Sequence, residues 1–406
     1  MMRDEYDVVV IGGGASGMAA AITLKRECPS WDVAVFEKKD VLLKKVSQTG
    51  NGRCNISNIN CEDQETVREF LRSVGISLRA DDEGRLYPYS EDAKDVCKLL
   101  IRSAEACGVE LYTEANVTKL ESIPFSINPR GGFNIFVGED EDEIYAENVV
   151  LSTGGKSFAN YGTSGDGYVF ARRLGHQVKK LAPALTAVEI IDNIKSLKGV
   201  RTKARVHLLR DGEEVFTDLG EVQFREDALS GICIMNMSGH IKLMGGETPE
   251  DGFKHYDVRL DLVPDHNSSE VREILKERLE MPGFDEAYAL KSLVKEELAQ
   301  YMIRKEKVFF SRWIGEKPSA EEVAGFLADE LADMRLKVKG LKGWNEAQVT
   351  SGGVVLEEVD PQTMESTVVP GLFLTGEVLD YDGPCGGYNL HHAWLTGIKA
   401  GKGLAR

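Results

Sequence analysis

The feature that most constrains the fold is a short apolar run near the amino terminus that three consecutive glycines follow at once. The run spans residues 8–11, and its lack of polar residues is typical of a parallel strand covered on both faces. Gly12 allows a tight turn, Gly14 leaves room for a phosphate at the start of a helix, and Gly17 lets helix and strand pack closely. The stretch therefore predicts a strand, a turn and a helix that bind a dinucleotide. The candidates for that contact are Gly12, Gly14, Ala15, Ser16 and Gly17.

A second predicted strand, residues 32–36, ends in an acidic residue at about the spacing that a dinucleotide site requires. The carboxylate of this residue, Glu37, can accept hydrogen bonds from the two hydroxyls of a ribose and would repel a 2′-phosphate. Lys38 follows it as a further cofactor-binding candidate. Strand, glycine turn, helix and acid together make a dinucleotide-binding domain the favoured interpretation.

Length and charge limit the remaining possibilities. A chain of 406 residues should hold two or three domains, and its formal charge of −17 opposes binding to a phosphate polymer. No apolar run approaches the roughly 20 residues that cross a bilayer, and residues 1–5 lack the apolar segment of a signal peptide, so we expect a cytoplasmic protein. The seven cysteines form no Cys-x-x-Cys pair and no cluster with histidine, which favours reduced thiols and no metal site.

A glycine-kinked polar loop shortly after Glu37 carries a more specific signal. Residues 50–55, with the sequence GNGRCN, resemble the signature of the HI0933-like or BaiN-like bacterial FAD-dependent oxidoreductases. Such a loop offers backbone N–H groups and one guanidinium to a pyrophosphate; the alternative is a surface loop that happens to contain two glycines. The family usually has glycine where this chain has Leu43. The FAD contacts that the resemblance implies here are Lys45, Gly50, Asn51, Gly52, Arg53 and Cys54.

Further stretches resemble the same family along nearly the whole chain. Residues 149–155 resemble the element that passes under a bound FAD, and residue Val117 matches a position whose backbone touches the adenine, although a plain sheet residue is the alternative. Residues 371–380 and 382–394 reproduce the carboxyl-terminal signature, in which a final helix directs its positive end at the flavin. The contacts implied in these stretches are Thr153, Gly154, Gly376, Glu377, Asp382, Gly387, Tyr388, Asn389 and Leu390.

The resemblance implies an α/β fold: a Rossmann-type, glutathione-reductase-like FAD-binding domain with an inserted β-barrel-like domain that carries a small helical subdomain. The pattern agrees, since residues 186–262 alternate as strands do, whereas residues 268–281, 284–305 and 319–334 show helical periodicity, with Ser319 and Glu322 as a capping box. We also expect helices at 65–74, 92–107 and 391–404, a turn at 84–88, a hairpin of 133–137 with 143–146, and a strand at 149–151. The expected boundaries are 1–186 with 345–406 for the FAD-binding domain, 187–264 with 335–344 for the β-rich substrate domain, and 265–334 for the helical insert.

The chemistry that the resemblance implies is NAD(P)H-linked reduction of an activated C=C bond, as in 3-oxo steroids or bile acids. Only one dinucleotide fingerprint is present, and FAD takes it, so NAD(P)H could bind only transiently or not at all. Candidate proton donors are Tyr388, His391 and His392 at the start of the last helix, although a histidine there can simply be packed. Cys385 is expected to have a packing or pocket role. Two alternatives stay open: a flavin-bearing redox or interaction protein without a small-molecule substrate, and a tRNA-modifying flavoenzyme, which the acidic charge opposes. The sequence leaves the oligomeric state open.

Overall fold

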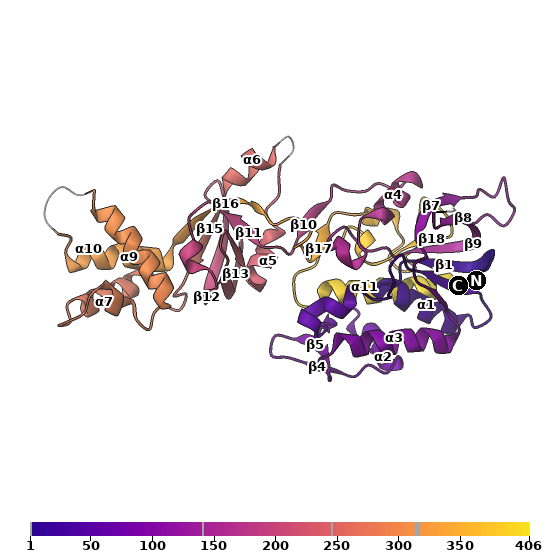
Figure 1. Ribbon diagram of the computed structural model, residues 1–406, viewed down its shortest axis with the longest axis horizontal. Helices are drawn as coiled ribbons and strands as arrows, with labels where there is room; N and C mark the ends of the chain where they lie inside the picture. The colour runs from indigo at the N-terminus through magenta and orange to yellow at the C-terminus, as the bar shows by residue number, and fades with distance from the viewer. Residues whose placement is uncertain (1, 140–141, 245–246, 313–316) are drawn as a thin grey trace. The chain divides into compact units, whose positions relative to one another are not determined.

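The computed structural model describes residues 2–139, 142–244, 247–312 and 317–406, and these divide into two compact units. The first unit contains the chain up to Ala184 together with Ala347–Arg406, and the second contains Leu185–Glu346. In Figure 1 the indigo amino terminus and the yellow carboxyl terminus both lie in the first unit. Two segments that are distant in sequence therefore build one domain, and the second unit is inserted between them.

A seven-stranded sheet forms the centre of the first unit, with the order β6-β2-β1-β9-β8-β7 and with β18 paired to β9. Its strands are β1 (Glu5–Ile11), β2 (Val33–Phe36), β6 (Glu110–Tyr112), β7 (Val117–Ser122), β8 (Phe133–Val137), β9 (Asp142–Leu151) and β18 (Leu372–Leu374). The strands β1, β2, β6, β9 and β18 run parallel, and the apolar residues of β1 are buried, as predicted for a covered parallel strand. The predicted hairpin exists between β8 and β9, and the strand expected at 149–151 is confirmed as the end of β9, which runs on to residue 151.

Helices α1 (Ala15–Glu27) and α11 (Tyr388–Leu404) pack closely beside each other at the sheet. Two glycines one helical turn apart make this approach possible, because a Cβ added at Gly397 would overlap the backbone oxygen of Ser16 and one added at Gly401 would lie 2.7 Å from that of Ala20. The remaining helices of the unit are α2 (Gln64–Ser73), α3 (Ala93–Cys107) and α4 (Asp166–Arg173). The helices expected at 65–74 and 92–107 are thus confirmed within a residue.

Two small sheets complete the first unit. The strands β3 (Ser57–Asn58), β5 (Arg85–Pro88) and β4 (Leu78–Ala80) form one, and β10 (Ala182–Ala184) with β17 (Val349–Ser351) forms the other. The turn expected at 84–88 is wrong beyond Gly84: that glycine turns with a φ of +75°, and residues 85–88 then pair with both neighbouring strands.

A closed antiparallel barrel with the order β11-β14-β13-β12-β15-β16 forms the centre of the second unit. Its strands are β11 (Val188–Ile190), β12 (Arg201–Arg210), β13 (Glu213–Phe224), β14 (Ala228–Ser230), β15 (Tyr256–Asp261) and β16 (Met334–Leu341). Alternate residues such as Val206, Leu208 and Val258 are fully buried in the core of this unit. The barrel-like domain is therefore confirmed, whereas helix α5 (Ile232–Ser238) was not expected within the β-rich stretch.

The other helices described in the second unit are α6 (Pro249–Gly252), α7 (Ser268–Leu279), α8 (Glu286–Leu290), α9 (Glu296–Phe310) and α10 (Ala320–Ala332). The capping box is confirmed, since the Ser319 hydroxyl accepts a bond from the Glu322 backbone and the Glu322 carboxylate accepts one from Ser319 N–H. A single helix at 284–305 is wrong: the chain leaves the helix after Leu290, and Ser292 takes a φ of +69°. The short 3₁₀ helices in the described ranges are η1 (Val46–Gly52), η2 (Ala159–Tyr161), η3 (Lys195–Leu197), η4 (Phe253–His255), η5 (Leu356–Glu358) and η6 (Gly376–Val378).

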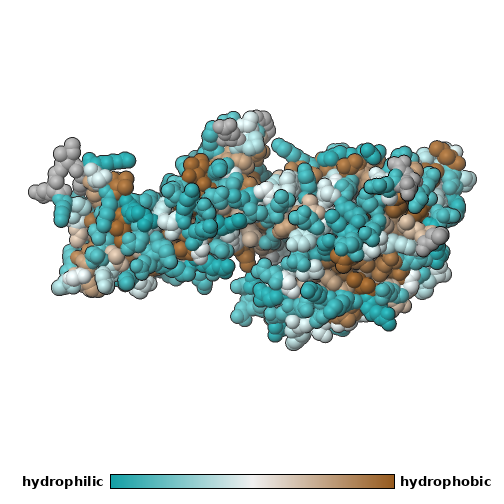
Figure 2. Space-filling model, in the orientation of Figure 1, coloured by the Kyte–Doolittle hydropathy of each residue, from teal (hydrophilic) through white to brown (hydrophobic). Residues whose placement is uncertain are grey.

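Hydrophilic residues cover most of the face shown in Figure 2, and hydrophobic residues gather there only in small groups. Within the described ranges, no helix is both long and apolar enough to span a membrane.

Candidate functional site

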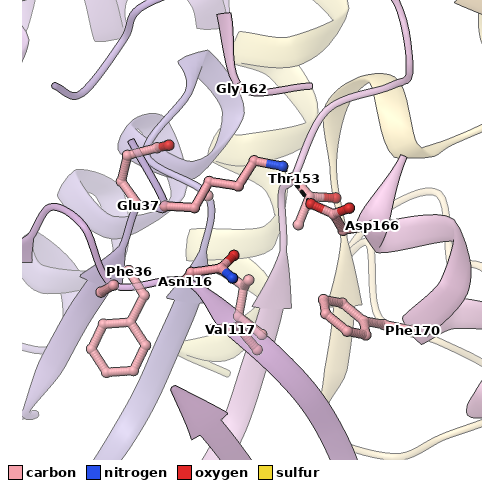
Figure 3. A pocket seen from close by; sticks show the side chains of 12 residues that line it. Phe36, Glu37, Asn116, Val117, Thr153, Gly162, Asp166 and Phe170 are labelled. Carbon is pink, nitrogen blue, oxygen red and sulfur yellow. Dashed lines mark hydrogen bonds and ion pairs between the residues drawn. The ribbon is translucent and has the colours of Figure 1, made fainter. Parts of the chain in front are cut away.

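A pocket lies in the first unit where the parallel strands β1, β2 and β9 end (Figure 3). Five residues that the sequence singled out line it together: Gly12, Glu37, Lys38, Val117 and Thr153. They come from four separate parts of the chain, after β1, after β2, from β7 and after β9. Ligands of open α/β sheets bind at this edge, beyond the carboxyl ends of the strands, so the geometry agrees with a nucleotide site.

The Glu37 carboxylate is held in place by the backbone. One oxygen accepts a hydrogen bond from Gly13 N–H and the other accepts one from Lys39 N–H, both at 2.9 Å. A carboxylate offers about four acceptor positions, so each oxygen keeps one for a ribose hydroxyl. The neighbouring Lys38 forms an ion pair with Asp166, and both residues line the pocket.

The glycine turn leaves open space where a phosphate would sit. Gly14 precedes the first residue of α1, no side chain caps the helix there, and a Cβ added at Gly14 would meet no atom within 4 Å. Gly12 has a φ of +109°, and an added Cβ would overlap the backbone oxygen of Ser152. Ala15 and Ser16 form the first turn of α1, where unpaired N–H groups and the helix dipole favour an anion.

A buried hydroxyl supports the same assignment. Thr153 lines the pocket, and its Oγ1 atom, which lies beside Gly167, is shielded from solvent and has no hydrogen-bond partner among the described residues. Buried hydroxyls are normally paired, so a bound polar ligand is a natural partner. Gly154 beside it turns with a φ of +71°. Ribose acceptor, phosphate space and unpaired hydroxyl together fit the nucleotide half of FAD.

The GNGRCN loop takes an unusual backbone path. Gly50, Asn51, Gly52 and Cys54 all have positive φ angles, between +55° and +85°. An added Cβ at Gly52 would meet no atom within 4 Å, so the loop leaves open space along its backbone. Cys54 itself is fully buried, and burial raises the pKa of its thiol to about 12. Any contact that Cys54 makes with a cofactor must therefore come from its backbone.

Arg53, the guanidinium of this loop, is half-exposed and lies over the Tyr87 ring, 5.1 Å from the ring centre. Among the described residues its closest carboxylate is that of Glu91, at 3.9 Å. A stacked, half-exposed guanidinium remains available to an anionic ligand, and its predicted contact with the pyrophosphate stays a prediction.

Lys45 and Glu377 meet although one precedes the GNGRCN loop and the other lies near the carboxyl terminus. Lys45 Nζ lies 2.8 Å from one carboxylate oxygen of Glu377 and 3.1 Å from Ser157 Oγ. The second Glu377 oxygen accepts bonds from Ser157 Oγ and from Thr350 N–H. The structure thus brings both predicted residues to one place, next to Gly376, whose φ is +70°. Ser157 and Thr350, which complete this network, were missed because single hydroxyl residues carry no distinctive pattern.

The last helix starts three residues earlier than expected, at Tyr388, and Gly387 precedes it with a φ of +100°. Asn389 closes the loop before the helix, because its side chain accepts a bond from Gly383 N–H and donates one to the Gly383 carbonyl. Leu390 packs against the core of the first unit, while Asp382 is exposed. Several predicted contacts therefore lie on one short stretch that leads into the helix.

The three proton-donor candidates have different surroundings. His391 is 4% exposed and both its ring nitrogens bind protein atoms, Ser57 Oγ at 2.8 Å and the Glu62 carbonyl at 2.6 Å. The His392 ring stacks on Tyr381 with centres 3.9 Å apart, and burial, with His391 close by, lowers the pKa of His392 to about 4. Tyr388 is half-buried at the first turn of α11.

Comparison with known proteins agrees with an FAD-binding domain. The FAD binding domain family matches residues 7–68, and the family described as HI0933-like protein Rossmann domain matches residues 62–403. A 3-dehydro-bile acid delta(4,6)-reductase from Clostridium scindens is 32% identical over 98% of both chains. A ribosomal RNA dihydrouridine synthase from Haemophilus influenzae is 24% identical over the whole of both chains.

Among solved structures, a 3-ketosteroid delta1-dehydrogenase from Sterolibacterium denitrificans has a similar fold. Its TM-score is 0.52 at 11% identity, with 99% of this chain and 100% of that chain covered. The identity is low, so this likeness supports the fold alone. Fold, site geometry and the match over most of the chain lead to one conclusion: the protein belongs to the HI0933-like family of Rossmann-fold proteins and is an FAD-dependent oxidoreductase.

Proposed function

We propose that the protein reduces a C=C bond conjugated to a carbonyl group, with NAD(P)H as the electron donor. The observation that carries this proposal is the nucleotide pocket itself, where the predicted residues Glu37, Val117 and Thr153 meet. It is supported by the similarity to a 3-dehydro-bile acid delta(4,6)-reductase, which is 32% identical over 98% of this chain. When bound, FAD would supply hydride transfer. The candidate substrates are enones such as 3-oxo-Δ4 steroids or bile acids.

Two relatives share a reaction class, the reduction of a C=C bond. This supports the proposed reaction type without identifying one substrate. The name of one relative states reduction of ring double bonds, and that of another states formation of dihydrouridine, which is uridine with its C5=C6 bond saturated. Both double bonds can conjugate with a carbonyl, so the same addition of a hydride and a proton serves both. The formal charge of −17 disfavours a nucleic-acid substrate for this chain.

In this proposal, residues of the first unit bind FAD and supply the proton. Glu37 would hold the ribose of FAD, the start of α1 its pyrophosphate, and the start of α11 would stabilise negative charge on the flavin. Of the three donor candidates, we propose Tyr388 as the group that gives a proton to the substrate carbon next to the carbonyl. The reason is that His391 uses both ring nitrogens within the protein and His392 is neutral at physiological pH.

The test uses yellow, FAD-loaded protein with NADH or NADPH under anaerobic conditions. Wild-type protein should reduce members of a panel of steroid and simple enones, and Tyr388→Phe should lower kcat at least tenfold with little change in KM. Oxidation of NAD(P)H by oxygen with every enone left intact would contradict the proposal and favour a redox or interaction protein. Reduction of uridine in a ribosomal RNA fragment, with no enone reduced, would identify RNA as the substrate.

A further inference from the structure

We infer that His391 is a positioning residue, which together with Ser57 fixes the start of helix α11 against strand β3 and thereby sets the properties of the bound flavin. The inference rests on the proposed role of α11 toward FAD. It gives His391 a function other than the proton donation that the sequence suggested.

The hydrogen bonds define how the imidazole is protonated. A carbonyl oxygen can only accept, so His391 Nε2, 2.6 Å from the Glu62 carbonyl, carries the proton. The neutral ring then accepts at Nδ1 from the Ser57 hydroxyl, at 2.8 Å. The ring is 4% exposed and Ser57 is fully buried, so the hydrogen bond between Ser57 and His391 is shielded from water, while the bond to the Glu62 carbonyl is partly buried. A ring used in this way has no proton to release to a substrate.

Three further contacts fasten the same two segments together. Asn58 Nδ2 donates to the Gly386 carbonyl at 3.0 Å, and Trp394 Nε1 donates to the Ile56 carbonyl at 3.1 Å. Gly387 lies so close that a Cβ added there would overlap the backbone oxygen of Ser57.

The segment 56–58 thus holds the residue before α11, the helix start and its second turn. Since it directly follows the GNGRCN loop, β3 links the loop proposed for the pyrophosphate to the helix proposed for the flavin.

The physical consequence concerns the helix dipole. The amino end of a helix carries roughly half a positive charge, whose effect falls off within one turn. A small displacement of α11 therefore weakens the preference for the reduced, more negative flavin. A tenfold loss of that preference corresponds to a reduction potential about 30 mV more negative for a two-electron couple.

The experiment measures FAD affinity and flavin reduction potential in the full-length protein, with no enone present. His391→Asn and Ser57→Ala should each weaken FAD binding at least tenfold and make the potential more negative. Ser57→Thr keeps the hydroxyl and should therefore keep the FAD affinity and the reduction potential of the wild type. The serine variant leaves the imidazole in place, so it keeps the test valid if the histidine variant folds poorly.

His176→Asn is a matched control. His176 is also 4% exposed in the first unit, and its two nitrogens bind Glu358 and the Ser366 hydroxyl, away from α11. It should lower stability without altering the potential.

Two results would overturn the inference. If His391→Asn and Ser57→Ala lose stability as His176→Asn does, with wild-type FAD affinity and potential, the contact is structural only. If His391→Asn keeps both flavin properties but abolishes enone turnover, His391 is the proton donor. Because the readout needs only the flavin, wild-type protein that binds FAD but reduces no enone would contradict the proposed function and leave this test intact.

Discussion

Lys45 and Glu377 are 332 positions apart in the chain, yet the ammonium nitrogen of one lies 2.8 Å from a carboxylate oxygen of the other. Their side chains are 26% and 18% exposed, so water screens this pair less than it screens a surface pair. The contact joins the segment before the GNGRCN loop to η6, and it therefore couples the two parts of the chain that form the first unit.

We predict that Lys45→Met lowers the free energy of unfolding by about 1–3 kcal/mol, because it leaves the Glu377 carboxylate without its cation. Glu377→Gln should be milder, since an amide oxygen still accepts from Thr350 N–H. The double variant should be more stable than the sum of the single effects predicts, as measured by urea unfolding. Lys44→Met is the control: Lys44 pairs with the exposed Asp40, and its loss should change little. Fully additive effects at Lys45 and Glu377 would contradict the coupling.

Leu43 adopts a backbone conformation that favours glycine, with a φ of +57°, at the position where the sequence resemblance implies glycine. The chain keeps this path because Leu43 N–H bonds to the Gly13 carbonyl at 2.9 Å and the side chain is 1% exposed. Leu43→Gly would relieve about 1–2 kcal/mol of strain but lose about 2–5 kcal/mol of packing. We therefore expect a net destabilisation of up to about 4 kcal/mol in chemical denaturation. A stabilised variant would show that strain outweighs packing at this position.

A buried carboxylate in α9 gives a prediction about pH. Glu306 is 3% exposed, one of its oxygens has no partner among the described residues, and burial raises the pKa of this carboxyl. The folded state then holds the proton more tightly than the unfolded state. The stability contribution of Glu306 is therefore full at low pH and is lost as pH rises through and above the ordinary glutamate pKa.

Glu306→Met should therefore stabilise the protein by about 1–3 kcal/mol at pH 8 and by less at pH 5. Calorimetry of the full chain at both pH values measures the difference. Glu297→Met, at an exposed position near the start of the same helix, controls for the loss of charge and should show no such gain. An equal effect at the two pH values would contradict the assigned pKa direction.

Local patterns predicted the first unit well, since the run 8–11, the glycine turn and Glu37 act over short distances. Local patterns gave a wrong prediction for residues 284–305. Helical periodicity runs through the whole stretch, but the helix is interrupted where Ser292 takes a left-handed conformation. The start of α11 was missed because Tyr388 directly follows glycines that indicate a loop. The pairing of Ser57 with His391 spans 334 positions, and no local pattern can indicate it.

The buried imidazole of His392 predicts loss of stability in mild acid. Burial lowers its pKa to about 4, against about 6.5 in the unfolded chain, and its Nε2 has no partner among the described residues. The unfolded state therefore binds the proton more readily. The contribution of His392 is full above pH 6.5 and is lost as pH falls from about 6.5 towards 4.

His392→Phe should remove this loss, because phenylalanine keeps a ring to stack on Tyr381 and cannot be protonated. Between pH 7.5 and pH 5 the wild-type protein should lose about 1–2 kcal/mol more than the variant in urea unfolding, since each pKa unit corresponds to about 1.4 kcal/mol. Identical losses in wild type and His392→Phe would show that His392 is not the group that titrates.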